Sequence, residues 1–223
     1  MFSVEIIESI KDPRIVEARS LISASGRQKQ QKCLLEGAAC IQFALREKIA
    51  IERIFCSQTG QTDPFLHSLA EKNIPCLAVS EGILKKISHT NYLIPYIGVM
   101  SIPTPFELEK IKGEPIIVLG QIEDHEALGT IIQAAYFAGI RNIGSTTSNF
   151  DPFFRRIVAA SHCTVFGIRQ KQFFSQEEAF HRLQMMQYEI VHCPFGPDFS
   201  LPLLLQKQFI ALFIETPVEG HAP

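Results

Sequence analysis

The sequence of 223 residues lacks the motifs that mark several large classes of binding protein. It contains no Gly-x-Gly-x-x-Gly and no Walker lysine motif, and these absences argue against a dinucleotide or nucleoside triphosphate site of the usual kind. It also contains no Cys-x-x-Cys pair and no His-x-x-x-His spacing, so we expect no metal site. The six cysteines lie mostly within apolar runs and are expected to be buried, reduced thiols.

Long apolar runs and a strong charge of one sign are missing as well. No run reaches the length needed to cross a bilayer, and the first residues do not form a signal-peptide pattern. We therefore expect a cytoplasmic protein that makes no contact with membranes. The formal net charge of −2 is not typical of a general nucleic-acid binder.

Charge is nevertheless uneven along the chain. Between Lys11 and Arg53, nine Lys/Arg residues stand against five Asp/Glu residues. A locally basic surface attracts a phosphate backbone, although the same excess is also found on ordinary solvated helices. On charge alone, both interpretations stay open.

Hydrophobic residues make up 46% of the chain and charged residues 20%, which predicts a packed globular core. In the first hundred residues, short apolar runs alternate with patterns of helical spacing, and this alternation predicts an α/β fold. Asp63 and Pro64 have the residue types expected at an N-cap and a first helical position. The expected strands are 33–35, 51–57, 74–80 and 96–102, and the expected helices follow Gly37, Asp63 and Ser80.

A polar segment rich in Pro and Gly, 103–114, is predicted to be a linker between two domains, 1–102 and 115–223. The second domain repeats the order strand then helix, which predicts a parallel sheet. Its strands are expected at 115–120, 141–145, 164–169, 188–194 and 209–215. Its helices are expected at 130–138, at 151–163 with Asp151 as cap, and after a capping box at Ser175 and Glu178.

The stretch Ile117–Ile140 carries the most information in the chain. Its pattern predicts a buried strand, a polar loop, a glycine at a helix entry and an apolar-faced helix. Gly129 could mark phosphate binding at a helix N-terminus, or it could simply allow a tight turn. Acid–base or metal chemistry is conceivable for Asp124, His125 and Glu126, but polar loop residues are the favoured interpretation.

Two pairs further along the chain are interpreted as packing residues. His162 and Cys163 fall at the end of the predicted helix of 151–163, beside apolar neighbours. Phe173 and Phe174 are assigned to the core rather than to a platform on which bases would stack.

The run from Asp124 to Ala135 resembles a motif of the SpoU/TrmH-type RNA 2′-O-ribose methyltransferases (the SPOUT superfamily). In that family Asp-Pro-x-Asn-x-Gly-x-x-x-Arg-x-Ala follows a buried strand, and Asp124, Gly129 and Ala135 keep the pattern. The resemblance continues through 153–166, and upstream through Arg27 and the Leu34-Leu35-Glu36-Gly37 run. It covers most of the chain and implies a small α/β substrate-binding domain followed by a parallel-sheet SPOUT-like domain.

Two reactive positions of the motif differ from the family pattern. Ala127 stands where the family has asparagine, and Gln133 stands where it has an arginine that the resemblance implies contacts RNA and acts as a base. Gln133, the candidate catalytic residue, cannot usefully take up a proton near neutral pH and carries no charge. Two such losses should lower the methylation rate by several powers of ten. We therefore predict impaired catalysis.

The resemblance also implies S-adenosylmethionine as the cofactor, a trefoil knot that encloses it, and a homodimer. In the family, a strand like 209–215 leads into a Gly-x-Glu-x-x-Gly loop, which makes Ile214, Glu219 and Gly220 the candidate cofactor-binding residues. The family's later motif, a Ser-Leu-Asn run and a final helix, does not occur in the sequence as printed. This predicts a truncated domain with an incomplete knot.

The first domain resembles the family's substrate-binding domain, which has a ribosomal-protein-like fold and helps to hold RNA. The candidate RNA-binding residues are Arg27, Lys29 and Lys32 in this domain, and Arg155 and Arg156 in the second. The sequence thus predicts an RNA-binding member of the family that acts on ribosomal or transfer RNA and is impaired in catalysis. The alternatives are a non-catalytic RNA-binding protein and a decaying remnant of the family.

Overall fold

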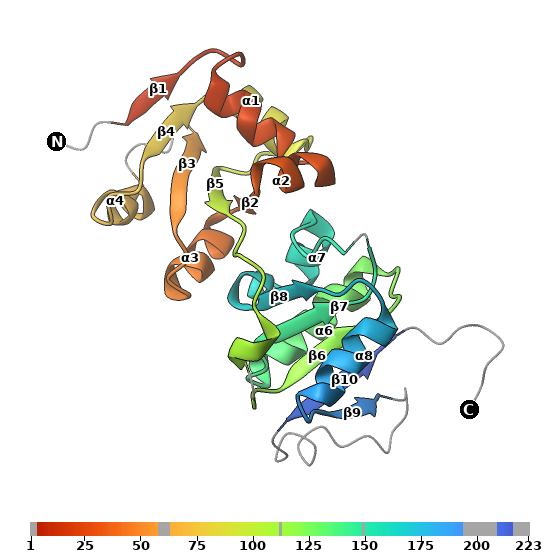
Figure 1. Ribbon diagram of the computed structural model, residues 1–223. Helices are drawn as coiled ribbons and strands as arrows, with labels where there is room; N and C mark the ends of the chain where they lie inside the picture. Colours follow the sequence, from red (N-terminus) through yellow and green to blue (C-terminus); the bar gives the residue numbers. More distant parts are fainter. Residues whose placement is uncertain (1–3, 58–62, 112, 149, 194–208, 216–223) are drawn as a thin grey trace. The chain divides into compact units, whose positions relative to one another are not determined.

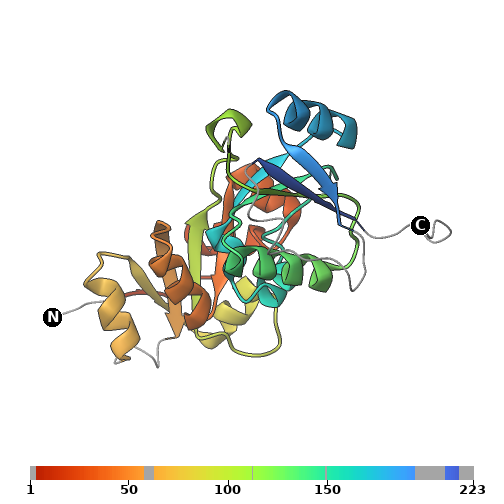
Figure 2. The same cartoon turned by 90° about the horizontal axis from the view of Figure 1, so that it is seen from below.

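The computed structural model describes residues 4–57, 63–111, 113–148, 150–193 and 209–215 (Figure 1). The chain divides into two compact units, Met1–Ile102 and Pro103–Pro223. Each unit is built on a five-stranded sheet that carries helices, as the two views of the ribbon show (Figure 1, Figure 2). The predicted α/β class is confirmed.

The first unit contains a mixed sheet. Strand β4 pairs in parallel with β1 and β3, whereas β5 runs antiparallel to both β3 and β2, and the strand order is β1-β4-β3-β5-β2. The strands are β1 (Glu5–Ile7), β2 (Lys32–Glu36), β3 (Ile51–Ser57), β4 (Cys76–Val79) and β5 (Tyr96–Ser101). The helices are α1 (Pro13–Ser20), α2 (Ala24–Gln30), α3 (Ala38–Arg46), α4 (Pro64–Ala70) and α5 (Glu81–Ser88).

Helices α1 and α5 cover one face of this sheet. Ile15 of α1 and Leu84 of α5 are fully buried in one cluster with Phe55 and Val99 of the strands. On the opposite face α3 approaches the sheet closely, because a Cβ added at Gly98 would lie only 3.6 Å from a side-chain carbon of Ile41. The four strands and three helices predicted here all form.

Three elements of the first unit escaped the sequence analysis, namely β1, α1 and α2. The strand has only three residues, and the two helices are short, so none shows a clear apolar period. The starts of the two helices are marked by residues whose side chains cap the first turn. The Asp12 carboxylate accepts the Arg14 N–H at 2.9 Å, and the Ser23 hydroxyl accepts the Gly26 N–H at 3.1 Å.

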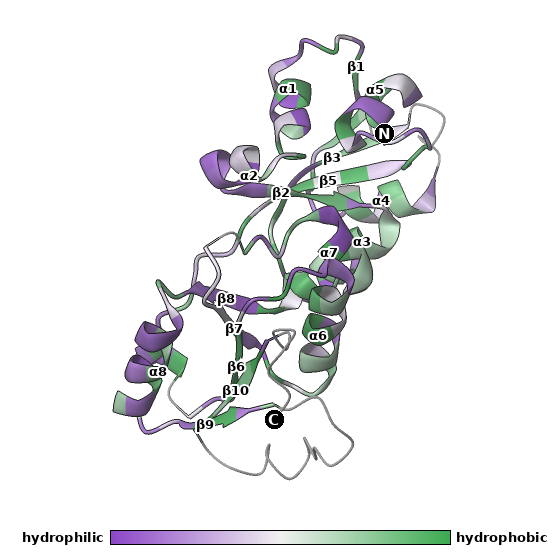
Figure 3. Ribbon diagram, turned by 90° about the vertical axis from the view of Figure 1, so that its right-hand side faces the viewer, coloured by the Kyte–Doolittle hydropathy of each residue, from purple (hydrophilic) through white to green (hydrophobic). Residues whose placement is uncertain are grey.

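The second unit contains an all-parallel sheet in the order β8-β7-β6-β10-β9, which confirms the predicted parallel sheet. The strands are β6 (Ile116–Leu119), β7 (Asn142–Ser145), β8 (Arg169–Gln172), β9 (Glu189–His192) and β10 (Ile210–Ile214). The edge strand β8 is hydrophilic along its length, whereas β6 and β10 are apolar (Figure 3). This polarity protects an edge that pairs on one side only.

Helices lie on both faces of the second sheet. One face carries α6 (His125–Phe137), α7 (Arg155–Ala160) and the 3-10 helix η3 (Thr164–Gly167). The other carries α8 (Gln176–Met185), whose Ala179 and Leu183 are buried in one cluster with Val118 and Phe213 of the strands. The strand order reverses between β6 and β10, and that reversal creates a topological switch point.

The segment predicted to be a linker, 103–114, belongs to the second unit. Phe106, Leu108 and Ile111 are buried in the same cluster as the strands, and Leu108 and Ile111 lie in the 3-10 helix η2 (Leu108–Ile111). The Phe106 N–H also donates to the carbonyl oxygen of Gln170 at 3.0 Å. Leu108 and Ile111, three residues apart between the flanking Pro and Gly residues, are the feature of the sequence that could have predicted a buried helical turn here.

The second unit differs from the prediction at the start of two helices and at one strand. Helix α6 begins at His125 and is capped by Asp124, so the interpretation of His125 and Glu126 as loop residues is wrong. Helix α7 begins at Arg155, three residues after the expected first position, Pro152, which is itself buried. The predicted strand of 164–169 is instead a 3-10 turn, and β8 follows it.

Cysteines lie buried in the core of the first unit. Cys33, Cys56 and Cys76 are buried thiols that form no disulfide, and burial raises the pKa of Cys56 to about 12. In the part of the chain that the structure describes, no cluster of His, Cys, Asp or Glu could hold a metal ion. None of its helices is long and apolar enough to cross a membrane.

Candidate functional site

The switch point of the second sheet is the first candidate site. In open parallel sheets, ligands bind outside the carboxyl ends of the strands where the strand order reverses. Here those ends are Leu119 of β6 and Ile214 of β10, which are paired in register. The Gly120 N–H donates to the Ile214 carbonyl at 2.8 Å, so the two strand ends are held together.

The chain passes very close to itself just beyond these strand ends. A Cβ added at Gly120 would lie 2.7 Å from the Cβ of Glu215 and 2.9 Å from the Phe213 ring. Only glycine therefore fits at this position. The Glu215 side chain, by contrast, is exposed, so its carboxylate stands at the rim of the switch point, where it can accept hydrogen bonds from hydroxyl or ammonium groups.

The end of β7 adds hydroxyl groups to the same edge. The Thr146 N–H donates to the Leu119 carbonyl at 3.0 Å, and the Ser145 and Thr147 hydroxyls lie 2.9 Å apart. This edge thus presents the Glu215 carboxylate and the partly exposed Thr146 and Thr147 around apolar strand ends, with the Ser145 hydroxyl buried behind them. Such a surface is suited to a polar ligand with an apolar ring system.

The candidate cofactor-binding residues are only partly placed. Ile214, the last residue of β10, lies at the switch point as expected from its position in the chain. Glu219 and Gly220 lie outside the described residues, as does most of the segment on which the predicted knot depends. Gly120 and Glu215 were missed, although each directly follows an apolar strand in the sequence.

The candidate catalytic residue, Gln133, lies on α6 where this helix packs against α7. Its Nε2 atom lies 3.0 Å from the Nδ1 atom of His162, and the hydrogen-bond roles depend on the histidine tautomer. His162 follows the helix in a left-handed conformation (φ 48°), so the prediction that it is helical is wrong. The two side chains form an uncharged or singly charged pair where the family motif has a guanidinium.

Gly129 allows the close packing of α6 on α7 and does not form a turn. A Cβ added at this position would lie 2.5 Å from the Cβ of Ala160 and 2.9 Å from the backbone oxygen of Ile157. The interpretation of Gly129 as a phosphate-binding turn is therefore wrong, because the residue lies inside the helix. Glycine is required at this position because the backbones of α6 and α7 approach each other too closely for a side chain.

The beginnings of α6 and α7 lie side by side. The His125 ring packs against the Phe154 ring, with 4.8 Å between the ring centroids. Arg155, which is partly exposed, and Arg156, which is exposed, therefore start their helix next to the N-terminus of α6. Their role as RNA contacts stays a prediction.

Arg27, a predicted RNA contact, has a structural role in the first unit. Its side chain is buried, and its Nη1 atom donates to the carbonyl oxygens of Leu21 and Ile22 at 2.7 Å each. These carbonyls follow the end of α1, where helix geometry leaves backbone oxygens without partners. The Arg27 guanidinium thus ties α2 to the end of α1, and its role as an RNA contact stays a prediction.

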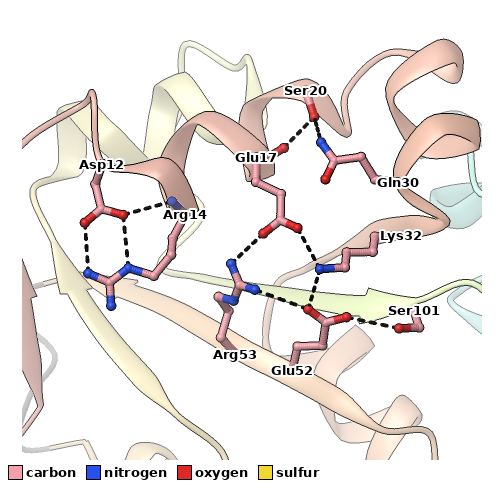
Figure 4. Close-up of polar contacts among 9 residues, drawn as sticks. All are labelled: Asp12, Arg14, Glu17, Ser20, Gln30, Lys32, Glu52, Arg53 and Ser101. Carbon is pink, nitrogen blue, oxygen red and sulfur yellow. Dashed lines mark hydrogen bonds and ion pairs between the residues drawn. The ribbon is translucent and has the colours of Figure 1, made fainter.

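Lys32 also differs from the free cation that was expected. Figure 4 shows its ammonium group between the carboxylates of Glu17, at 2.6 Å, and Glu52, at 2.8 Å. Arg53 binds the same two carboxylates, so two cations and two anions form a closed, partly buried network. Burial raises the pKa of Glu17, but the hydrogen bonds from Lys32 and Arg53 outweigh this effect and hold the pKa below its usual value.

Two of the exposed cations of the first unit are Lys29 of α2 and Arg19 of α1. Gln30, the neighbour of Lys29, donates its amide N–H to the hydroxyl of Ser20, the neighbour of Arg19, at 2.6 Å (Figure 4). Lys29 was predicted as an RNA contact, and Arg19 was missed because its helix was missed. Together they are the exposed basic pair that α1 and α2 present.

Comparisons with known proteins agree with this fold. A family model described as the MRM3-like substrate binding domain matches residues 12–92. A curated relative, an uncharacterized tRNA/rRNA methyltransferase of Synechocystis sp., is 24% identical over 180 residues, which are 78% of this chain and 66% of that protein. The chain thus spans just under two thirds of the length of this relative.

Solved structures of similar fold cover the chain more fully. The rRNA methyltransferase of Sinorhizobium meliloti is 20% identical, with a TM-score of 0.78, and the match covers 100% of this chain and 85% of that one. The SpoU methyltransferase AviRb of Streptomyces viridochromogenes, in complex with AdoMet, is 16% identical, with a TM-score of 0.76 and coverage of 94% and 83%. The matched domain, the curated relative and the shared fold all show similarity to RNA methyltransferases, and the fold is that of the SpoU-type enzymes.

Proposed function

We propose that this chain binds ribosomal or transfer RNA through its first unit, binds S-adenosylmethionine at the switch point of its second unit, and is impaired as a 2′-O-methyltransferase. The observation that carries the proposal is the pairing of Gln133 with His162 in a chain whose two units otherwise follow the family. Such a protein would act in the cytoplasm, where these RNAs are found.

RNA binding by the first unit is supported by the family model that matches residues 12–92 and by the exposed pair Arg19 and Lys29. Lys32 and Arg53 contribute little to attraction at a distance, because Glu17 and Glu52 neutralise them. The RNA backbone would therefore approach the α1–α2 surface rather than the network shown in Figure 4.

The described residues at the switch point fit part of the proposed cofactor. The Glu215 carboxylate could accept hydrogen bonds from ribose hydroxyls or from an ammonium group, and Gly120 leaves the strand ends free of a side chain of its own. Ile214 would supply apolar surface beside them. When bound, S-adenosylmethionine supplies an activated methyl group, and the same cofactor is present in the similar AviRb structure.

Impaired catalysis follows from the chemistry at Gln133 and Ala127. Transfer to a ribose hydroxyl requires that the hydroxyl be held in place and that its proton find an acceptor. The Gln133 amide is neutral and already hydrogen-bonded to His162, and Ala127 has no polar group. Each lost contact of this kind costs about 2–4 kcal/mol of transition-state stabilisation, or roughly two to three powers of ten in rate.

Calorimetric titration of the full chain with S-adenosylmethionine tests this proposal. We expect saturable binding of the cofactor. In a separate assay with bulk RNA and the same cofactor, we expect methyl transfer to stay at background. Transfer at a rate typical of enzymes would overturn the claim of impairment. Absence of cofactor binding by a chain that is folded by circular dichroism would favour the alternative, a non-catalytic RNA-binding protein. Sedimentation of the same preparation would test the homodimer that the family resemblance implies.

Reversing the charge of the exposed basic pair tests the RNA-binding surface. We expect Arg19→Glu combined with Lys29→Glu to weaken RNA binding, and to reduce the slope of log affinity against log salt by about two, because two phosphate contacts are lost. Fluorescence anisotropy over a salt series measures both effects. The matched control is Lys72→Glu with Lys86→Glu, two exposed lysines of the same unit. Equal losses from both pairs would show that only net charge matters and would contradict the proposed surface.

A further inference from the structure

Phe173 and Phe174 are adjacent in sequence but have opposite environments. Phe173 is 1% exposed and lies in the core of the second unit, whereas Phe174 is 96% exposed. The assignment of both residues to the core is therefore wrong for Phe174. Among the large hydrophobic side chains that the structure describes, this ring is the most exposed.

The backbone around Phe174 is held in place on both sides. Phe173 packs so closely on β7 that a Cβ added at Gly144 would lie 2.5 Å from its ring, and its N–H donates to the Ser145 carbonyl at 2.8 Å. On the other side, the Phe174 N–H donates to the Glu178 carboxylate at 2.5 Å. The exposed ring thus projects from a fixed backbone.

Phe174 also lies at the edge of the sheet where the candidate site is. It follows β8 and precedes α8, so it stands beyond the carboxyl end of β8, at the same edge as Leu119 and Ile214. Strand β8 is two strands away from β6, and neighbouring strands lie about 5 Å apart, so this strand end is roughly 10 Å from that of β6.

We propose that Phe174 stacks on a base of single-stranded RNA, beside the switch point where the cofactor is proposed to bind. The proposal rests on the proposed RNA-binding function. The adjacent Phe173 is buried, and the next residues along the chain, Ser175, Gln176 and Glu177, are polar, so they add no apolar side chain to the exposed ring. Protein interfaces need about 1,000 Å² of contact, which one ring cannot supply, whereas one ring is enough to stack on one base.

Charges near the ring are compatible with a nucleotide. The Lys171 ammonium group lies 5.8 Å from the ring centroid of Phe173, the residue before Phe174, so a cation is present in the same stretch of chain. The negative charge of Glu178 is partly compensated, because its carboxylate accepts the Phe174 N–H and lies 3.4 Å from Arg182. Glu177 is exposed and opposes a close phosphate, so stacking rather than phosphate binding is the interaction that Phe174 supplies.

Binding of short oligoadenylate and oligouridylate to the full-length chain tests the proposal. We expect Phe174→Ala to weaken binding of oligoadenylate about tenfold, Phe174→Tyr to leave it unchanged, and Phe174→Leu to weaken it like alanine, since leucine is apolar but cannot stack. Oligouridylate should lose less, because uracil stacks more weakly. The matched control is Phe137→Ala, which removes another exposed phenylalanine from the far end of α6.

The outcomes separate this proposal from the proposed function. Equal affinities of wild type, Phe174→Ala and Phe137→Ala would overturn stacking while leaving RNA binding intact. Full retention by Phe174→Leu would also overturn it, because the ring would then act as a general apolar contact, such as a protein contact. If the wild-type chain bound neither oligonucleotide, both the RNA proposal and this one would fail.

Discussion

Gly129→Val is expected to destabilise the second unit by about 3 kcal/mol. The new side chain would meet Ala160 and the backbone of Ile157 and Ser161, and backbone atoms cannot move aside without separating α6 from α7. Overpacking of a buried contact costs about 1–3 kcal/mol, and a clash with backbone lies at the upper end of that range.

Urea unfolding followed by circular dichroism measures this effect. With a slope of about 1–3 kcal/mol per molar urea, the midpoint should fall by roughly 1–3 M. The matched control is Gly82→Val, because a Cβ added at Gly82 would meet only the Ser80 hydroxyl, at 3.9 Å. That variant should change the midpoint very little. An unchanged midpoint for Gly129→Val would show that the two helices do not pack as closely as described here.

Gly129 also shows why the sequence predicts strands better than helix limits. The strands β6 and β10 can be found from the sequence alone, because each lies wholly within a continuous hydrophobic stretch. Glycine lowers helix propensity, so its presence moved the predicted start of α6 to Thr130. The compensating contact with Ala160 lies 31 residues away and cannot be read from local pattern.

The candidate site shows the same division between local and long-range information. Ile214 could be predicted from the family pattern, because it ends an apolar strand. The Gln133 position was also predicted, but its pairing with His162 depends on how α7 ends, and that turn was expected to be helical. Phe173 and Phe174 follow β8, so their side chains point in opposite directions, one into the core and one to solvent. Because the strand was predicted at 164–169, this alternation could not be assigned from the sequence.

Arg27→Met is expected to lower the stability of the first unit by about 3 kcal/mol without a specific loss of RNA affinity. Methionine can fill part of the space but cannot donate, so the carbonyls of Leu21 and Ile22 would each lose a hydrogen bond at 2.7 Å. A buried polar group without a partner costs about 1–3 kcal/mol. The urea midpoint of the first unit should therefore fall.

Lys29→Glu is the matched variant, because Lys29 lies two residues further along the same helix and is exposed. We expect the opposite result from it, namely unchanged stability and weaker, less salt-dependent RNA binding. Both measurements should be made at a temperature where each variant is folded. If Arg27→Met kept its stability and lost RNA affinity, the guanidinium would contact RNA as its sequence position suggests. If Arg27→Met lost stability and kept its RNA affinity, Arg27 would be the residue that holds α2 in place. Arg27 would then position Lys29 for the RNA through the placement of α2.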